Sequence, residues 1–523
     1  MLKRLLLCVA LLMLIVPVQA QDARIKIDID RTIGEIDPMI YGNFSEHMGR
    51  CIYGGIYEEN SPLSDSRGFR TDVLKAVKGL NVPILRYPGG NFVSNYHWLD
   101  GVGPKDQRVP RMELAWGWNE SNRFGTNEFI EYCREIGTEP YLAVNLGTGT
   151  WDEARAWVEY CNVKEGPYYA ELRKQHGYPE PHNVKYWSLG NEMDGPWQMG
   201  HRSADDYGAF ALEAGKLMRR TSRDIKLIAA GSSNYNPDAD PNAWNRTILQ
   251  YMKDQADYIA LHIYIGNRDD NYYNFLSRPL LVEERTKIVE GMIDEVTLGA
   301  NRGGRPPIKI AWDEWNVWYR SRGGGQRALE EQYNLEDALA VATFLNVFVR
   351  NAHVVKMANM AQIVNVIAPI FTSKTDMYRQ PIYFPLALFA NNVFGTALDV
   401  HVDCGTYTAT PPGVQFNHRS AIPMNREIPW LDVSAALQDG QVVINVVNRH
   451  QTESIATDII CQEGQFNGTF TVSEVNGPDV KAQNTFGKEV VTTQQKPDIT
   501  GGGGVIRYTF PPHSFTQITG RIQ

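Results

Sequence analysis

Two glutamates in the sequence stand in the same kind of setting. Glu192 follows an Asn after the mostly apolar run 186–190, and Glu314 ends the similar run 308–313. Short runs of this kind are typical of buried parallel strands, which carry polar groups out at their carboxyl ends. Two carboxylates delivered in this way could serve as a general acid/base and a nucleophile. Asp313 directly precedes Glu314, so it should point to the opposite face of the strand and is the weaker candidate.

The segments that must position these glutamates alternate along the chain between strand-like and helix-like patterns. The strand candidates are 38–44, 83–87, 140–146, 184–190, 225–231, 258–264, 308–315 and 355–364. Amphipathic helical candidates lie between them at 71–80, 125–137, 150–162, 203–222, 244–256 and 333–351. This alternation predicts a (β/α)8 TIM barrel over residues 38–397. An open doubly wound sheet is the alternative, but no Gly-rich phosphate loop follows any strand, which favours the barrel.

The last part of the chain has a different sequence pattern, in which helical periodicity gives way to short alternating runs. Over residues 398–523, short alternating runs such as 441–447 and 506–510 are separated by Asn-Gly, Gly-Pro and a run of four Gly. This pattern predicts a C-terminal antiparallel β-sandwich. The segment 21–37 also contains a strictly alternating run, and we expect it to pair with the sandwich and not with the barrel.

Polar residues follow nearly every predicted barrel strand, where the active sites of such barrels form. They are Glu46, Arg86, Asn91, Asn145, Asn191, Glu192, His262, Tyr264, Glu314, Gln362 and Asn365. Several have simpler interpretations: Arg86 could neutralise buried carboxylates, Asn145 could be a turn residue, and Trp116 could be packing. His262 has no HxH or HExxH partner, so it fits a core histidine better than a metal ligand.

Carboxylates on the fourth and seventh strands fit glycoside hydrolysis. In that chemistry one carboxylic acid protonates the leaving oxygen while the other carboxylate attacks the anomeric carbon. Asn191, beside Glu192, could bind the sugar 2-hydroxyl, a contact expected to strengthen in the transition state.

Composition and the start of the chain bear on partners and location. The formal charge of −9 argues against nucleic acid or an anionic membrane as the main partner.

Residues 1–20 combine a short basic start, an apolar core over 5–15 and small residues before position 21, which predicts a signal peptide. The apolar core is shorter than the roughly 20 residues that a membrane span needs, so we expect export to the periplasm or cell exterior without a membrane anchor. The remaining cysteines are odd in number and scattered, which indicates neither a disulfide framework nor a zinc site; they are Cys51, Cys133, Cys161, Cys404 and Cys461.

A set of motifs resembles those of the α-L-arabinofuranosidases of glycoside hydrolase family 51, whose fold is a (β/α)8 barrel with a β-sandwich. The resemblance covers about residues 38 to 395 and continues weakly to the end of the chain. The motifs lie at 40–47, 50–55, 85–92, 97–104, 113–116, 122–126, 190–197, 261–264, 313–315 and 361–366.

The resemblance implies Glu192 as the general acid/base and Glu314 as the nucleophile of a retaining enzyme. It also implies no cofactor, no metal and a homo-oligomer, often a hexamer. The implied contacts to the arabinofuranosyl unit are Glu46, Arg86, Asn91, Asn191, Tyr264 and Gln362, with Trp116 at the site wall and His262 beside the nucleophile. Some relatives have Cys in place of Asn91, and many are cytoplasmic whereas this chain carries an export signal. The segment 320–332 after the nucleophile strand is a candidate lid.

The leading hypothesis is therefore an exo-acting hydrolase that releases terminal non-reducing α-L-arabinofuranose from arabinan, arabinoxylan or their oligosaccharides. A related barrel glycosidase acting on xylosides or β-glucans is the second hypothesis. A non-catalytic carbohydrate-binding protein is the third, and the presence of both glutamates disfavours it.

Overall fold

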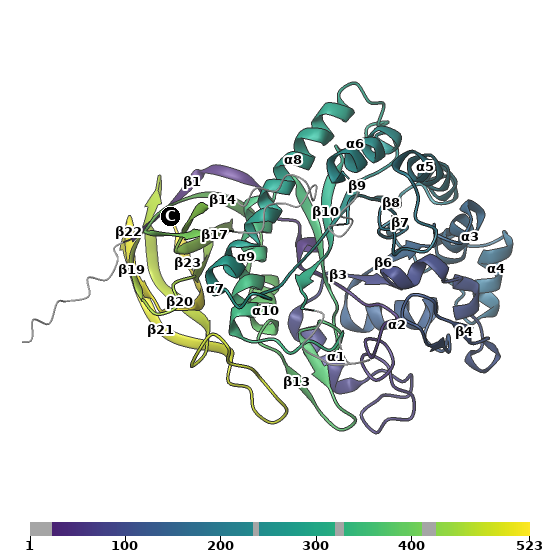
Figure 1. Cartoon of the computed structure of the whole chain (residues 1–523), viewed down its shortest axis with the longest axis horizontal. Helices are drawn as coiled ribbons and strands as arrows, with labels where there is room; N and C mark the ends of the chain where they lie inside the picture. The colour runs from purple at the N-terminus through teal and green to yellow at the C-terminus, as the bar shows by residue number, and fades with distance from the viewer. Residues whose placement is uncertain (1–22, 234–239, 320–328, 411–424) are drawn as a thin grey trace, which may run out of the picture.

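The structure is a computed structural model that describes residues 23–233, 240–319, 329–410 and 425–523. A barrel with surrounding helices lies beside a curved sheet, with α7, α9 and α10 between them (Figure 1). The predicted signal peptide and most of the candidate lid lie outside the described residues. No helix among those that are described is long and apolar enough to cross a membrane.

Within the described residues, eight parallel strands form a closed barrel, which confirms the predicted fold. In spatial order they are β10 (Lys309–Val317), β11 (Val355–Ala361), β2 (Gly42–Phe44), β3 (Ile84–Tyr87), β6 (Glu139–Val144), β7 (Tyr186–Leu189), β8 (Lys226–Ala230) and β9 (Tyr258–Ile265). The first predicted strand, 38–44, was wrong in its first half. Asp37 accepts a hydrogen bond from the backbone N–H of Met39, and Pro38 sets the first turn, so Pro38–Tyr41 form the 3-10 helix η1.

The helices that cover the barrel match the predicted helical segments to within a few residues and include several more. The matched ones are α1 (Thr71–Leu80), α2 (Thr126–Ile136), α3 (Trp151–Asn162), α5 (Ala204–Thr221), α6 (Pro241–Met252) and α9 (Leu335–Arg350). The additional ones are α4 (Tyr168–Gln175), α7 (Tyr272–Ser277), α8 (Leu280–Thr297) and α10 (Tyr383–Asn392). Most of α10 is apolar and buried, so it lacks the two-faced pattern by which a surface helix is found.

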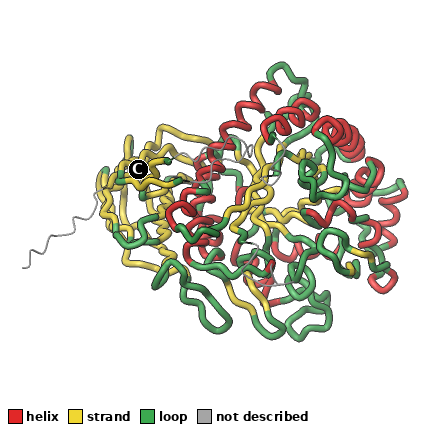
Figure 2. The backbone as a smooth tube through the Cα atoms, in the orientation of Figure 1, coloured by secondary structure: helices red, strands yellow, loops and turns green. Residues whose placement is uncertain are grey.

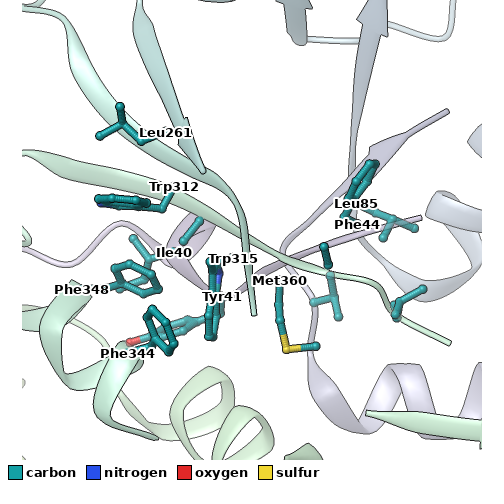
Figure 3. Close-up of a cluster of buried hydrophobic side chains, with 14 of the residues drawn as sticks. Ile40, Tyr41, Phe44, Leu85, Leu261, Trp312, Trp315, Phe344, Phe348 and Met360 are labelled. Atoms are coloured by element: carbon teal, nitrogen blue, oxygen red, sulfur yellow. The ribbon is translucent and has the colours of Figure 1, made fainter. Parts of the chain in front are cut away.

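The nucleophile strand β10 is fixed by packing on its outer face. Trp315 lies 5.0 Å from the ring of Phe344 and 5.2 Å from that of Phe348, both on α9 (Figure 3). Burial of such rings stabilises the strand by roughly 1.5–3 kcal/mol for each side chain. Because neighbouring residues on a strand face opposite ways, anchoring Trp315 on the outside turns Glu314 toward the barrel interior.

The C-terminal part of the chain forms one nine-stranded sheet that is mostly antiparallel. Its strands lie together at one end of the molecule, beside the helices that separate them from the barrel (Figure 2). Its order is β21 (Thr492–Gly503), β20 (Phe466–Asn476), β23 (Ser514–Ile522), β18 (Gln441–Asn448), β17 (Leu431–Gln438), β14 (Thr396–Asp403), β1 (Ala23–Glu35), β19 (Ile455–Gln462) and β22 (Val505–Phe510). β1 pairs antiparallel with β14 and parallel with β19. Ile459 and Phe470, from strands far apart in this order, share one apolar core, so the sheet curls over on itself.

A buried charge cluster joins the barrel to this sheet. Asp432 on β17 accepts hydrogen bonds from Arg350 on α9 at 3.1 Å and from Arg449 at 2.7 Å. Asn346 of α9 also donates to Asp432, at 2.8 Å. Burial acts to raise the pKa of Asp432, but the two arginines outweigh it and hold that pKa below its usual range.

Asp432→Ala is expected to destabilise the folded chain by about 3 kcal/mol, because it leaves the buried Arg449 and the partly buried Arg350 without their shared carboxylate, although Arg350 keeps Glu283 as a second partner. The midpoint of urea unfolding measures this loss. The matched control is Asp458→Ala, which removes an exposed partner of Arg507 and should cost at most about 1 kcal/mol. The pKa of Asp432 is lower in the folded than in the unfolded chain. Its contribution to the free energy of unfolding is therefore complete above the unfolded-state pKa of about 3.9, and it is lost as the pH falls through the folded-state pKa. An equal effect of the two variants would contradict the prediction.

Candidate active site

A cavity of about 310 Å³ opens at the carboxyl ends of the barrel strands. Residues that the sequence predicted for the site line most of it: Glu46, Asn91, Trp116, Glu192, Tyr264, Glu314 and Gln362. Further lining residues were not predicted: Met48, Gly90, Trp197, Trp318 and Ile367. Strands that are far apart in the sequence therefore deliver the two glutamates to one enclosed space.

Glu314 on β10 is held by two donors. Arg86 Nη1 donates to Oε1 at 2.8 Å, and the Tyr264 hydroxyl donates to Oε2 at 2.9 Å. Burial raises the pKa of Glu314; His262 and Arg86 act in the opposite direction, and the charge of Glu192 adds to the rise. The carboxylate is thus fixed in position, with charge-assisted hydrogen bonds supporting its anionic form.

Glu192 follows β7 on a sharp turn, with Gly190 and Glu192 itself at positive φ, 83° and 44°. Its Oε1 lies 3.0 Å from His262 Nδ1, and its Oε2 accepts a hydrogen bond from Trp197 Nε1 at 2.7 Å. Trp197 was missed as a site residue, although it follows Glu192 by five positions in a Gly-Pro-Trp turn. At Gly195 an added Cβ would lie 2.4 Å from the Trp197 ring, so glycine lets that ring fold back toward Glu192.

Glu46 forms a third carboxyl group in the cavity wall. It accepts hydrogen bonds from the Phe92 backbone N–H at 3.1 Å, Trp116 Nε1 at 3.2 Å and Gln362 Nε2 at 2.9 Å. Burial above all, and then the nearby charge of Glu314, raise the pKa of Glu46 to about 8 despite these donors. At neutral pH this group is therefore mostly protonated and can also donate a hydrogen bond to a hydroxyl group.

Gly90 lies between Glu46 and Glu314. A Cβ there would meet Glu46 Oε2 at 2.9 Å and Glu314 Oε1 at 3.3 Å. We expect Gly90→Ala to displace both carboxyl groups and to lower kcat/KM by roughly 10²-fold, the order of loss caused by a misplacement of about 1 Å. Steady-state kinetics measure the loss. Gly291→Ala on α8 is the control, since nothing lies within 4 Å of its added Cβ; comparable kinetics for the two variants would refute the steric argument.

Three predicted residues, Arg86, Asn191 and His262, are not among those that line the cavity, but Arg86 and His262 contact the glutamates that do. Arg86 and Asn191 are fully buried, and Arg86 Nη2 donates to Asn191 Oδ1 at 2.6 Å. The Asn191 Nδ2 group is buried without a hydrogen-bond partner among the described residues. His262 is the third, 5% exposed. Asn145, in contrast, caps a turn, because its Oδ1 accepts the backbone N–H groups of residues 147–149.

The predicted orientation of Asp313 was wrong. The register between β9 and β10 runs from Ala311 opposite Ala260 to Glu314 opposite His262, so β10 contains one extra residue at this point. Such a bulge breaks the alternation of side chains. Asp313 consequently points inward as well: it is fully buried, and the Tyr141 hydroxyl donates to its Oδ2 at 2.9 Å.

Glu192, His262 and Glu314 bring possible metal-ligand atoms within 4.8 Å of one another. A metal would need a neutral imidazole with a free nitrogen. Both nitrogens of His262, however, face carboxylates: Nδ1 faces Glu192, and Nε2 lies 3.1 Å from Asp313 Oδ1. The arrangement therefore favours proton chemistry over metal ligation.

Known proteins share this architecture over nearly the whole chain. The α-L-arabinofuranosidase C of Emericella nidulans is 42% identical over 94% of this chain and 96% of its own. The solved structure of the GH51 α-L-arabinofuranosidase from Thermotoga petrophila is 44% identical, with a TM-score of 0.86 over 95% of this chain and 99% of its own. The chain belongs to the α-L-arabinofuranosidases of glycoside hydrolase family 51.

Further comparisons also assign the chain to this family. The family model for the α-L-arabinofuranosidase 1 domain matches residues 76–278, and the one for the α-L-arabinofuranosidase C-terminal domain matches 313–514. An intracellular exo-α-(1→5)-L-arabinofuranosidase of Halalkalibacterium halodurans is 41% identical over 91% of this chain and 94% of its own. The resemblance read from the motifs is confirmed.

Proposed function

We propose that this enzyme is a retaining, exo-acting glycoside hydrolase that releases terminal non-reducing α-L-arabinofuranosyl residues. The observation that carries the proposal is the position of Glu192 and Glu314 in one cavity, with an oxygen of each within 4.8 Å of the other. Retaining glycosidases hold their two carboxyl groups about 5–5.5 Å apart, whereas inverting ones leave about 6.5–9.5 Å for a water molecule.

The proposed reaction has two displacements. First, Glu314 attacks the anomeric carbon while Glu192 gives its proton to the glycosidic oxygen, so the bond to the leaving sugar breaks and an arabinosyl ester forms. Then Glu192, now a carboxylate, takes a proton from water, which attacks the same carbon and releases Glu314. Arg86 and Tyr264 hold the Glu314 carboxylate, and Trp197 and His262 hold that of Glu192.

The remaining polar groups are the proposed contacts to the sugar. Glu46, Asn91 and Gln362 line the cavity and present hydrogen-bonding groups to a small polyhydroxylated ligand. The unpaired Asn191 Nδ2 is a donor available to the 2-hydroxyl, a contact that would strengthen in the transition state. Arabinan, arabinoxylan and their oligosaccharides are the proposed substrates. We expect α-(1→5)-linked arabinooligosaccharides to be preferred, because the H. halodurans relative is named as an exo-α-(1→5)-L-arabinofuranosidase.

The test is the release of arabinose from debranched arabinan and from arabinoxylan, with the product anomer followed by proton NMR at early times. We expect single arabinose units, released first as the α-anomer. First release of the β-anomer would contradict retention, and internal cleavage to mixed oligosaccharides would contradict exo action. Faster turnover of aryl xylosides or β-glucosides than of the arabinofuranoside would favour the second hypothesis, and binding without product would favour the third.

We also propose export and self-association. The composition of residues 1–20 supports export; N-terminal sequencing of the protein from culture medium or periplasm should begin after position 20, and recovery only from cytoplasm with an intact start would refute export. The homo-oligomer, a hexamer by family resemblance, is tested by light scattering on a sizing column, where a monomer mass near 59 kDa would contradict it.

A further inference from the structure

The ring of His262 stands among three carboxyl groups. Its Nδ1 lies 3.0 Å from Glu192 Oε1 and 3.5 Å from Glu314 Oε2, and its Nε2 lies 3.1 Å from Asp313 Oδ1. All four side chains are at most 7% exposed. His262 therefore contacts both proposed catalytic glutamates, and Asp313 contacts it from the opposite side.

This geometry favours a doubly protonated His262 ring. Because a carboxylate accepts hydrogen bonds only, the Asp313 contact requires a proton on Nε2 of His262. A neutral ring with that proton would present the lone pair of Nδ1 to the oxygens of Glu192 and Glu314. The contact with the Glu314 carboxylate would then be repulsive, and a protonated Glu192 could satisfy the lone pair only by turning its proton toward Nδ1 and away from the glycosidic oxygen. A doubly protonated ring instead donates to both sides. Burial acts to lower the pKa of His262, but Glu314, Asp313 and Glu192 together raise it well above its ordinary value.

Asp313 is itself fixed by groups that support its charge. The Tyr141 hydroxyl donates to Oδ2 at 2.9 Å, and Arg86 Nε lies 3.7 Å from the same oxygen. Burial would raise the pKa of Asp313, yet Arg86 and His262 hold it below its usual range. The bulge in β10 makes this contact possible, because a regular strand would point Asp313 away from the barrel interior.

We propose that Asp313 is a positioning residue that keeps His262 as an imidazolium, so that this cation supports Glu314 in the first displacement and Glu192 in the second. The proposal rests on the roles given to the two glutamates above. Asp313 touches no reacting atom, and its effect passes through the His262 ring.

Charge balance in the two half-reactions explains why His262 should carry two ring protons. The balance is drawn for five groups: Glu192, Glu314, Asp313, His262 and Arg86. Before the first displacement Glu192 is protonated, and the charges of Glu314 and Asp313 balance those of His262 and Arg86. In the arabinosyl ester Glu314 is neutral and Glu192 is a carboxylate, so the sum over these five groups is again zero. With a neutral His262 the five groups would carry an uncompensated negative charge in both states, which is costly in a low-dielectric interior.

Other ionisable groups surround His262. Asp194, which follows Glu192 and accepts hydrogen bonds from Ser233, has its pKa raised to about 6 by burial and by Glu192. Among the described residues, the other charged or titratable neighbours of the cluster include Glu46, Arg86, Tyr141, Tyr207 and Tyr264. Within this set Asp313 is the carboxylate that contacts Nε2 of His262.

The direct test is NMR of ring-labelled histidine in the full-length enzyme, with the His262 signal assigned by its absence in His262→Gln. We expect wild-type His262 to remain doubly protonated at pH 7 and above. In Asp313→Asn, which keeps the shape but removes the charge, its titration should fall by about 1 to 3 pH units. A neutral His262 at pH 7 in the wild type would overturn the proposal, whether or not any variant folds.

Activity provides the second readout and the control. In Asp313→Asn the alkaline limb of the pH–kcat/KM profile should move to lower pH by a similar amount, because His262 now loses its proton sooner. Tyr141→Phe removes the other donor to Asp313 but not the carboxylate, so His262 should stay protonated in it. Equal behaviour of the two variants would indicate a merely structural role and overturn the proposal. If no arabinofuranoside is hydrolysed, the proposed function fails while the NMR titration still tests the role of Asp313.

Discussion

Glu314→Ala is expected to lower kcat/KM on an aryl α-L-arabinofuranoside by at least about 10⁴-fold, the order found when a covalent nucleophile is removed. The variant keeps Glu192, but no group remains to form the arabinosyl ester. Arg86 and Tyr264 lose the acceptor they share, so the donors that position the carboxylate cannot replace its chemistry. Initial-rate kinetics on the aryl substrate measure the effect.

Added azide makes this prediction specific. In Glu314→Ala the anion can enter the space left by the carboxylate and attack the anomeric carbon from the same side. Activity should partly return, and the product should be the β-configured arabinosyl azide, with inversion. Glu427→Ala, an exposed glutamate on the C-terminal sheet domain, is the control and should leave kcat/KM unchanged. If azide gave the β-azide with Glu192→Ala and left Glu314→Ala inactive, the two roles would be reversed.

The barrel could be predicted because its strands are short and buried, and each ends in polar residues. Those features are local, so β7 and β10 could be located with their glutamates from the sequence alone. The first strand shows the limit of this approach. Residues 38–41 have strand-like side chains, but the cap by Asp37 and the fixed φ of Pro38 turn the backbone into a 3-10 helix. Local hydrogen bonding outweighed side-chain preference at that point.

The parts of the site that were missed depend on contacts distant in sequence or on backbone irregularity. A bulge is invisible to a rule of strict alternation, and it turned Asp313 from an outward residue into a partner of His262. Met48 and Ile367 carry no chemical signal, and they belong to the cavity only because the closed barrel brings them to its mouth. Trp197 did carry a signal, since a tryptophan in a Gly-Pro turn close to a candidate acid is poorly explained by core packing.

Glu192→Ala is expected to have an effect that depends on the leaving group. A leaving phenolate of low pKa needs little proton donation, so cleavage of a 4-nitrophenyl arabinofuranoside should continue through the first displacement. An oligosaccharide leaves as an alkoxide unless it is protonated, and its kcat/KM should fall by roughly 10²–10⁴-fold, the usual contribution of general acid catalysis. Kinetics on both substrates, with the exposed Glu180→Ala as control, measure the difference.

The second displacement provides an independent check on Glu192. Because Glu192 also activates water, its removal should slow hydrolysis of the arabinosyl ester, and an initial burst of nitrophenol should precede a slow steady state. Azide needs no base, so it should accelerate this step and give the α-configured azide, with net retention. An equal loss on both substrates, without a burst and without azide rescue, would mean that Glu192 acts through positioning and not as a proton carrier. The opposite azide configurations of the two variants thus separate the nucleophile from the acid/base within one pair of experiments.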